Sequence, residues 1–198
     1  MTDLFQEPDD ATPLEPEERR ALRQTWITHR NDLNEAEQEN ILQGANWARG
    51  NRRLKLTDML TDDFMRTLHL RMFGEVWQWA GAYRRTERNI GIEAYRIPFE
   101  VPNLLGDVRY WVEHGTYPPD EVAVRLHHRL VAIHPFPNGN GRHARLVADL
   151  VIENFGGEPF NWGDGNIADI GRLRAEYIKA LKAADNHDIA PLMAFAKS

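Results

Sequence analysis

The sequence predicts an all-α protein that carries one short β-hairpin. Over most of the chain, apolar residues recur at spacings of three and four, which is the period of a helix with one buried face. Residues 82–98 break this period, because they hold β-forming side chains between a glycine and a proline, which favours a short hairpin. No internal repeat or low-complexity block interrupts the chain, so we expect one domain with N-terminal additions.

The N-terminal additions are expected to be a flexible acidic tail followed by helices up to residue 58. Residues 1–17 combine acidic side chains and prolines with few apolar groups, which is typical of a flexible tail. Apolar residues four positions apart predict a helix over 18–30. A capping-box-like start at Asn34 and a stop at Gly50 predict a second helix, near residues 34–49.

The third helix has the clearest pattern. Thr61 can cap its N-terminus, and Gly81 can end it. Its apolar stripe is interpreted as core packing and consists of Met65, Leu68, Met72, Val76 and Trp79. Further helices are expected over residues 99–114, 119–133, 142–155, 169–184 and 189–196.

Composition narrows the class of protein. The chain has 198 residues, a hydrophobic fraction of 42% and a formal net charge of −6, so it can form a core and is not favoured to bind nucleic acid. It has no cysteine, which excludes disulfides and zinc–thiolate sites. The start of the chain lacks the apolar stretch of a secretory signal, and no run approaches membrane-spanning length. We expect a cytoplasmic protein without a membrane segment; whether it forms a homo-oligomer is open.

The most informative segment runs from His134 to Arg145 and reads HPFPNGNGRHAR. A histidine that precedes a glycine-lined turn can take a proton from an incoming hydroxyl. The glycines let the backbone approach a ligand, and the first N–H groups of the helix that follows attract phosphate. Arginines add bidentate contacts to the same anion. This order predicts a general base, then a phosphate cradle, then a helix.

This segment resembles the signature of the Fic (filamentation induced by cAMP) family, written HPFx[DE]GNGRxxR. The matching residues are His134, Pro135, Phe136, Gly139, Asn140, Gly141, Arg142 and Arg145, and the departure is Asn138, where the family has an acidic residue. A weaker resemblance covers residues 60–195, which implies a Fic-type helical bundle over residues 59–198 whose hairpin is a flap.

The resemblance implies a protein adenylyltransferase, which transfers AMP from ATP to a Ser, Thr or Tyr hydroxyl of a target protein. It implies His134 as the catalytic base and a phosphate site of Gly139, Asn140, Gly141, Arg142 and Arg145. We expect Pro135 and Phe136 to anchor the loop in the core, and His143, which faces away from the arginines, to be structural or exposed. Doc, a relative that transfers phosphate, has lysine at the position of Gly141, so glycine here favours AMP transfer.

Asn138 puts the metal site in question. The resemblance implies that this position binds the Mg²⁺ that bridges the phosphates, but an amide oxygen is a weaker ligand than a carboxylate. We therefore expect a magnesium-dependent enzyme with weakened metal affinity. The alternative is a catalytically weak or inactive nucleotide-binding regulatory module.

Two further regions are implied to act on the same site. The flap would align the target through Ile90, Gly91 and Ile92; the alternative is a hairpin that only covers the core. Glu39, followed by Asn40, fits the end of the family's inhibitory pattern [ST]xxxE[GN], although Glu35 replaces its Ser or Thr. An inhibitory Glu39 would pair with the second signature arginine; the alternative is an acidic exposed helix face.

Two other function classes compete. A metal hydrolase could use a local cluster, but its spacing matches no common site: His127, His128, His134, His143 and Asp149. A basic stretch near Trp47 could bind nucleic acid but is more typical of a solvated turn: Arg49, Arg52, Arg53 and Lys55.

Overall fold

The computed structural model describes residues 20–24, 26–27, 30–51, 53–163 and 170–198. The expected tail over residues 1–17 lies outside these ranges. The described part is helical and confirms the all-α class. Its elements are α2 (Arg30–Gly50), α3 (Leu56–Met59), α4 (Asp62–Phe73), the 3₁₀ turn η1 (Ala94–Arg96), α5 (Ile97–His114), α6 (Pro119–Ile133), α7 (Asn140–Asn154), α8 (Ile170–Asp185) and α9 (Ala190–Lys197).

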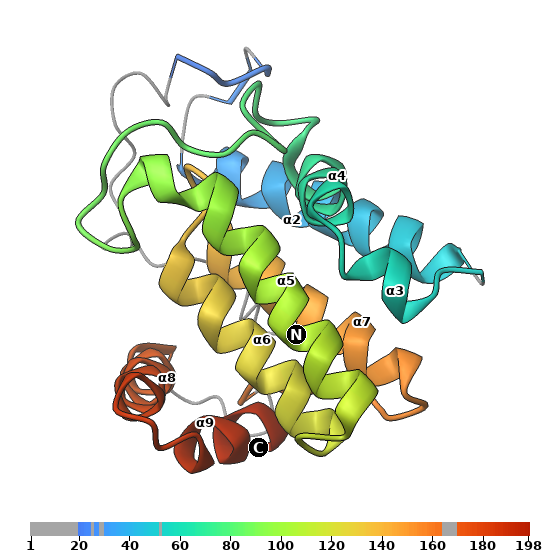
Figure 1. The fold of residues 1–198 in the computed structure, drawn as a ribbon. Helices are drawn as coiled ribbons and strands as arrows, with labels where there is room; N and C mark the ends of the chain where they lie inside the picture. Colours follow the sequence, from blue (N-terminus) through green and yellow to red (C-terminus); the bar gives the residue numbers. More distant parts are fainter. Residues whose placement is uncertain (1–19, 25, 28–29, 52, 164–169) are drawn as a thin grey trace.

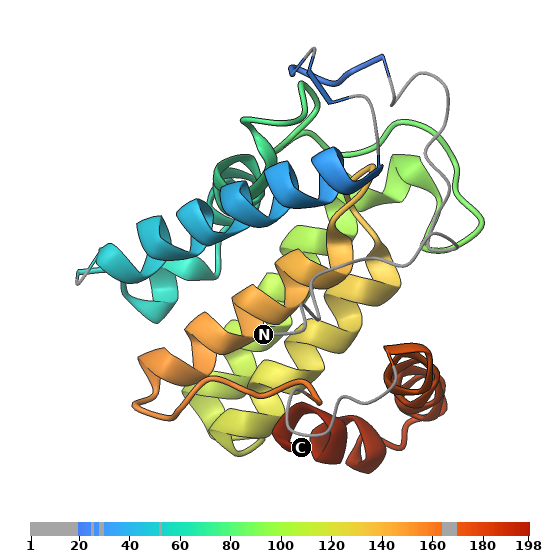
Figure 2. The same cartoon turned by 180° about the vertical axis from the view of Figure 1, so that it is seen from behind.

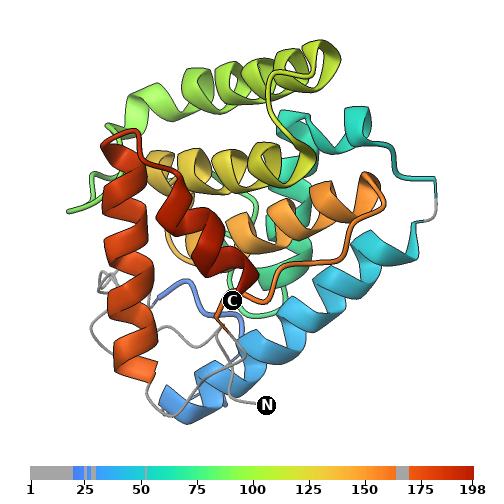
Figure 3. The same ribbon diagram turned by 90° about the horizontal axis from the view of Figure 1, so that it is seen from below.

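Three aligned helices, α5, α6 and α7, form the centre of the molecule (Figures 1 and 3). On one side α4 packs against α7, and α2 lies across α4 (Figure 2). On the other side α8 and α9 pack together, with α9 against α6. The signature loop joins α6 to α7, so it lies at one end of the central layer. Within the described part, no helix is both long and apolar enough to cross a membrane.

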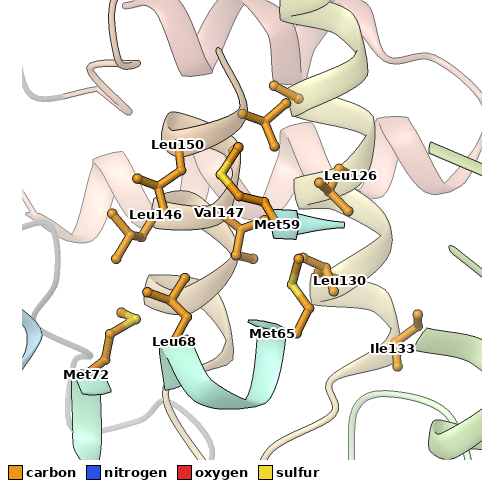
Figure 4. Packing of buried hydrophobic residues seen from close by; sticks show 14 of the residues in the cluster. Met59, Met65, Leu68, Met72, Leu126, Leu130, Ile133, Leu146, Val147 and Leu150 are labelled. Atoms are coloured by element: carbon orange, nitrogen blue, oxygen red, sulfur yellow. The ribbon is translucent and has the colours of Figure 1, made fainter. Parts of the chain in front are cut away.

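The core forms where α3 and α4 meet the central helices. Figure 4 shows Met65 and Leu68 of α4 pointing toward apolar side chains of α6 and α7. Met65, Leu68 and Met72 are at most 1% exposed, which confirms the interpretation of this stripe as core. The α4 helix begins as expected, because the Thr61 side chain accepts a hydrogen bond from the N–H of Phe64 (3.2 Å).

The N-terminal helix expected over residues 18–30 is wrong where the structure describes it. Leu22 instead forms an isolated antiparallel bridge with Trp77. The N–H of Arg23 donates to the carbonyl of Val76 (2.8 Å), and that of Gln78 donates to Ala21 (2.9 Å). Peptide groups that pair with a distant segment cannot also form helical bonds. The same pairing accounts for the end of α4 at Phe73, earlier than the expected stop at Gly81.

The flap segment, residues 82–98, lacks the paired strands of a hairpin in the structure. Residues 82–93 form an irregular loop, and the chain then enters η1 and α5. Within this loop, the backbone carbonyls of Thr86 and Ile92 accept hydrogen bonds from the Arg84 guanidinium instead of from a paired strand. The loop also joins the signature region through the Arg84 N–H, which donates to Pro135 (2.9 Å), and the Ile92 N–H, which donates to Ile133 (3.4 Å).

Candidate active site

His134 ends α6 in a left-handed conformation (φ 53°), and its N–H donates to the carbonyl of Leu130. This conformation is costly for a residue with a side chain, and such strain is found at functional sites. The side chain is buried, and its Nδ1 has no hydrogen-bond partner among the described residues. Burial, then the charges of Arg84 and Arg88, lower the pKa of His134 to about 4. The imidazole is therefore neutral at pH 7 and can accept a proton.

The loop after His134 is closed by Asn140. Its Oδ1 accepts from the N–H of Phe136 (2.8 Å), and its Nδ2 donates to the carbonyl of Phe136 (2.9 Å). The Phe136 ring is fully buried and stacks on His69, with ring centroids 3.7 Å apart. The Asn140 side chain thus shapes the loop, and only its backbone N–H can contribute to the phosphate site predicted from sequence. The expected role of Phe136 as an anchor is confirmed.

The two glycines of the loop serve different purposes. Gly139 has φ +76°, and a Cβ there would lie 2.4 Å from the Phe73 ring, so the fold requires glycine. A Cβ at Gly141 would meet nothing within 4 Å. The fold therefore does not require glycine at 141, and the space beside it is open. The α7 helix begins here, at Asn140, with no side-chain cap on its first N–H groups.

Arg142 is buried and forms an ion pair with Glu37 of α2, with Nη1 and Oε2 2.8 Å apart. The other oxygen of Glu37 accepts from Nε1 of Trp77 (2.6 Å). The Arg142 guanidinium also lies over the Phe73 ring, 5.0 Å from its centroid. Helix α2 thereby reaches the signature loop through one buried carboxylate.

Arg145, one turn further along α7, lies over the ring of Tyr177 from α8, with its guanidinium carbon 4.8 Å from the centroid. The Tyr177 hydroxyl forms a hydrogen bond with Nε2 of His127 on α6 (3.0 Å). Burial, then the charge of Arg145, lower the pKa of His127 to about 3. The second signature arginine thus contacts α8 directly, and Tyr177 links it to His127 of α6.

Asn138 is half-buried and turns its side chain back on the loop. Its Oδ1 accepts from the N–H of Gly139 (2.6 Å), and its backbone carbonyl binds Nε2 of His69 (3.1 Å). The described residues contain no group of three or more His, Cys, Asp or Glu side chains arranged to hold a metal ion. One neutral oxygen that already accepts a hydrogen bond is a poor magnesium site. These residues do not form a metal centre by themselves.

The side chains of two further candidate residues, Glu39 and His143, contact groups outside the proposed phosphate site. Glu39 is exposed and contacts Gln43 on its own helix (3.4 Å), so the expected pairing of Glu39 with a signature arginine is wrong. Side chains on one helix face recur every three or four residues, and Glu39 lies two positions beyond the buried Glu37. His143 is buried and bonds to the carbonyl of Met65 (3.0 Å), which confirms a structural role.

Residues of the two competing function classes, the metal hydrolase and the nucleic-acid binder, also bind other side chains. His128 bonds to Asp185 (2.8 Å), away from the pair of His127 and Tyr177. Asp149 accepts from the Trp162 indole (3.0 Å). In the basic stretch, Arg49 pairs with Glu153 (2.9 Å), whereas Arg52 lies outside the described residues.

Three side chains at the site are missed by the sequence reasoning: Glu37, His69 and Arg84. Glu37 could have been found from helical period, because it lies four residues before Ile41 and therefore on the apolar face of α2. A charged residue on such a face needs a buried partner. His69 falls similarly next to the stripe of α4. Arg84 had no signal in the sequence, since its acceptors are backbone carbonyls, one of them on the distant His134.

Comparisons with known proteins identify the family of the chain. The sequence profile of the Fic/DOC family matches residues 59–152. Protein adenylyltransferase fic-1 of Caenorhabditis elegans is 31% identical over 142 residues, which are 70% of this chain and 27% of that protein. Protein adenylyltransferase Fic of Drosophila grimshawi is 30% identical over 65% of this chain and 26% of its own length. The chain thus spans about a quarter of these curated relatives.

Solved structures show the same fold. Fic-1 from C. elegans (residues 134–508) matches with a TM-score of 0.60 and 27% identity, covering 81% of this chain and 48% of that chain. BepC from Bartonella tribocorum, solved with bound AMPPNP, matches with a TM-score of 0.64 and 19% identity over 86% of this chain and 87% of that chain. With the signature loop between α6 and α7 and the profile match around it, the chain is a member of the Fic/DOC family.

Proposed function

We propose that the chain transfers AMP from ATP to a Ser, Thr or Tyr hydroxyl of a protein. The observation that carries this proposal is the buried imidazole of His134, whose Nδ1 has no hydrogen-bond partner among the described residues and which one short loop separates from the start of α7 at Asn140. The names of the relatives support it, since both are protein adenylyltransferases. BepC, solved with AMPPNP, supports a nucleoside triphosphate as the substrate.

In the proposed reaction, the oxygen of the target hydroxyl attacks the α-phosphorus of ATP. The bond between this phosphorus and the bridging oxygen breaks, pyrophosphate leaves, and the hydroxyl proton passes to His134. The N–H groups at the start of α7 would bind phosphate oxygens in the space above Gly141. Arg142 and Arg145 would neutralise the β- and γ-phosphates. Most of the rate would come from this positioning and charge stabilisation.

Labelled ATP tests the reaction type. We expect protein in a cell lysate to retain label from α-labelled ATP and none from γ-labelled ATP, and His134→Ala to abolish the signal. Retention from the γ position would instead identify a kinase.

The second candidate, a nucleotide-binding regulatory module, is favoured by the Asn138 oxygen that is already bonded to Gly139. Binding of ATP without retained label from either position would identify that module.

For the target, we propose an extended segment that passes over the flap loop at Ile90, Gly91 and Ile92. Ile90 is 46% exposed, and the Gly91 backbone lies against His134, since a Cβ at 91 would be 2.6 Å from the histidine Cβ. A peptide laid along this loop would bring a hydroxyl to the base. Ile90→Asp should raise KM for the protein target and leave KM for ATP unchanged. An equal effect on both constants would refute the loop as the target site.

We further propose autoinhibition by Glu37 instead of Glu39. The buried pair with Glu37 engages Arg142, which the β-phosphate of ATP needs. A nucleotide that binds fully must compete with this carboxylate, so the paired state would be the resting state. The ion pair is nearly dry, and losing one partner of such a pair is costly because the other charge is left buried and unpaired.

The matched variants Glu37→Gln and Glu39→Gln test this regulation. Glutamine at 37 can still accept the hydrogen bond from Trp77 but cannot neutralise Arg142. We expect Glu37→Gln to raise the rate of automodification with ATP by about tenfold, which corresponds to about 1.4 kcal/mol less competition between the carboxylate and ATP for Arg142. Glu39→Gln should leave this rate unchanged. The reverse ranking would restore Glu39 as the inhibitor, and two unchanged rates would remove the proposal.

A further inference from the structure

The Arg84 guanidinium occupies an unusual place for a charged group. It is 3% exposed, and its main contacts are backbone carbonyls on two segments that are distant in sequence. Nε donates to the carbonyl of His134 (2.7 Å), Nη1 to that of Thr86 (3.0 Å), and Nη2 to that of Ile92. Burying a guanidinium is costly unless its donors are satisfied, so a position of this kind needs several acceptors in a fixed arrangement.

The contact with His134 bears directly on its backbone. His134 has a positive φ of 53°, which a residue with a Cβ adopts only when its surroundings hold it there. Its carbonyl accepts from the Arg84 side chain, and the neighbouring carbonyl of Pro135 accepts from the Arg84 backbone N–H (2.9 Å). One residue of the flap loop therefore binds the two consecutive peptide carbonyls that follow the His134 Cα.

From this geometry we propose that Arg84 is a positioning residue, which clamps the backbone of His134 and joins the catalytic base to the flap loop. The proposal rests on the proposed role of His134 as the base. Gly91 allows the flap loop to pack closely against His134 and Arg84. It has φ +90°, and a Cβ there would lie 2.6 Å from the His134 Cβ and 2.9 Å from Nη2 of Arg84. The catalytic base and the flap loop are thus held in a fixed relative position, so a target bound on the flap loop presents its hydroxyl to His134.

The clamp also affects proton affinity. The charged groups that face His134 are Arg84 and Arg88, both from the flap loop, and the nearby carbonyl of Val131 acts in the opposite direction. Glu87 faces Arg84, with Nη1 of Arg84 and Oε2 of Glu87 3.9 Å apart. Removing the positive charge at 84 should therefore raise the pKa of His134, which tests whether Arg84 lies beside the imidazole in solution.

The test compares Arg84→Met and Arg84→Lys with Arg85→Met. Arg85 is the exposed neighbour in the chain, so its variant removes the same charge without touching the carbonyls. The titration of His134 is followed by NMR of ¹⁵N-histidine-labelled protein, assigned with His134→Ala. AMP transfer is followed as kcat and KM against pH, and thermal unfolding checks the fold.

With the clamp as proposed, Arg84→Met raises the titration midpoint of His134 and lowers kcat by about 10²-fold, the cost of a misplaced catalytic group, with little change in KM for ATP. Arg84→Lys keeps the charge and the low midpoint but still loses kcat, because an ammonium cannot reach three carbonyls in a planar fork. Arg85→Met matches the wild type in both. If Arg84→Met does not fold, Arg84→Lys decides alone: a kcat equal to that of Arg85→Met overturns the clamp.

The two proposals fail separately. If the wild type transfers no AMP while the His134 midpoint still rises in Arg84→Met, the contact between Arg84 and His134 stands and the proposed function falls. If the wild type transfers AMP but the Arg84 variants have the midpoint and kcat of Arg85→Met, the function stands and the clamp is wrong.

Discussion

Asn138 is the position where the signature loop lacks the carboxylate of the Fic family. Its amide oxygen already accepts from the N–H of Gly139, so magnesium would be held mainly by the phosphates of the nucleotide. We expect Asn138→Asp to lower the magnesium concentration for half-maximal AMP transfer by about tenfold, because a carboxylate adds an anionic ligand worth about 1.4 kcal/mol. The exposed Asn103→Asp on α5 adds the same charge elsewhere and should have no effect. An unchanged magnesium dependence in Asn138→Asp would place the side chain away from the metal.

Of the two loop glycines, Gly139 is expected to matter for the stability of the fold and Gly141 for the binding of ATP. Gly139→Ala puts a Cβ at positive φ and 2.4 Å from Phe73, so it should cost about 2–4 kcal/mol of unfolding free energy from strain and overpacking. Gly141→Ala meets no atom and lies in a helix, so it should stabilise the fold by about 0.4–1 kcal/mol. It should also weaken ATP binding about tenfold, because the new methyl group fills the proposed phosphate space. Urea denaturation and calorimetric titration check the pair; unaltered ATP affinity in Gly141→Ala would argue against a phosphate there.

Among the elements, α4 couples Gly81, the residue just before the flap segment, to the signature loop through His69. Its Nδ1 accepts from the N–H of Gly81 (3.0 Å), so in the neutral ring Nε2 carries the proton and donates to the carbonyl of Asn138 (3.1 Å). Burial, then the neighbouring His143, hold the pKa of His69 well below its usual range. The ring therefore stays neutral and keeps both bonds at physiological pH.

Replacement of His69 by leucine should leave two buried backbone groups without a partner. Each costs about 1–3 kcal/mol, so His69→Leu should lose roughly 2–6 kcal/mol of unfolding free energy. Surface changes usually stay within about 0.5 kcal/mol, and His114→Leu at the exposed end of α5 serves as the control. Chemical denaturation measures both. Equal losses in the two variants would show that the His69 bridge adds nothing to stability.

The helices could be predicted from sequence where their signals are local. The cap at Thr61, the stripe through Met65 and Leu68, and the helix over residues 119–133 follow from period and capping alone. The flap could not, because its conformation depends on Arg84 binding carbonyls that the sequence brings near only after folding. The contact residue of α2 was misplaced for a related reason: the motif spacing favoured Glu39, whereas burial is decided by the helix face that meets α4 and α7.

At the scale of the whole molecule, a chain of contacts links the signature loop to the C-terminal helices. Arg145 lies over Tyr177, the Tyr177 hydroxyl bonds to His127, and the His127 ring packs on Trp162 (centroids 4.5 Å apart). The Trp162 indole donates to Asp149 of α7 (3.0 Å), the helix on which Arg145 also lies. Asp149 therefore holds the segment that supports the second signature arginine.

Burial is the main cause that raises the pKa of Asp149 to about 7; hydrogen bonds from Trp162 and Phe160 oppose it. Because this folded pKa lies above the unfolded value, the folded state binds more protons between about pH 4 and 7, and Asp149 lowers stability as pH rises through that window. An asparagine side chain at this position would keep both hydrogen bonds, since both donors reach Oδ1, and would not ionise.

We therefore expect Asp149→Asn to gain unfolding free energy relative to the wild type between pH 5 and pH 8, by an amount on the order of 1–3 kcal/mol. The buried histidines 69, 127, 134 and 143 have lowered pKa values and destabilise the fold in acid, but they do so in both proteins. The difference between the two curves isolates Asp149. Urea denaturation followed by tryptophan fluorescence gives this difference, with the exposed Asp107→Asn as control. A difference that stays constant with pH would mean that Asp149 ionises as readily in the folded chain as in the unfolded one, and that its link to Trp162 is maintained at no electrostatic cost.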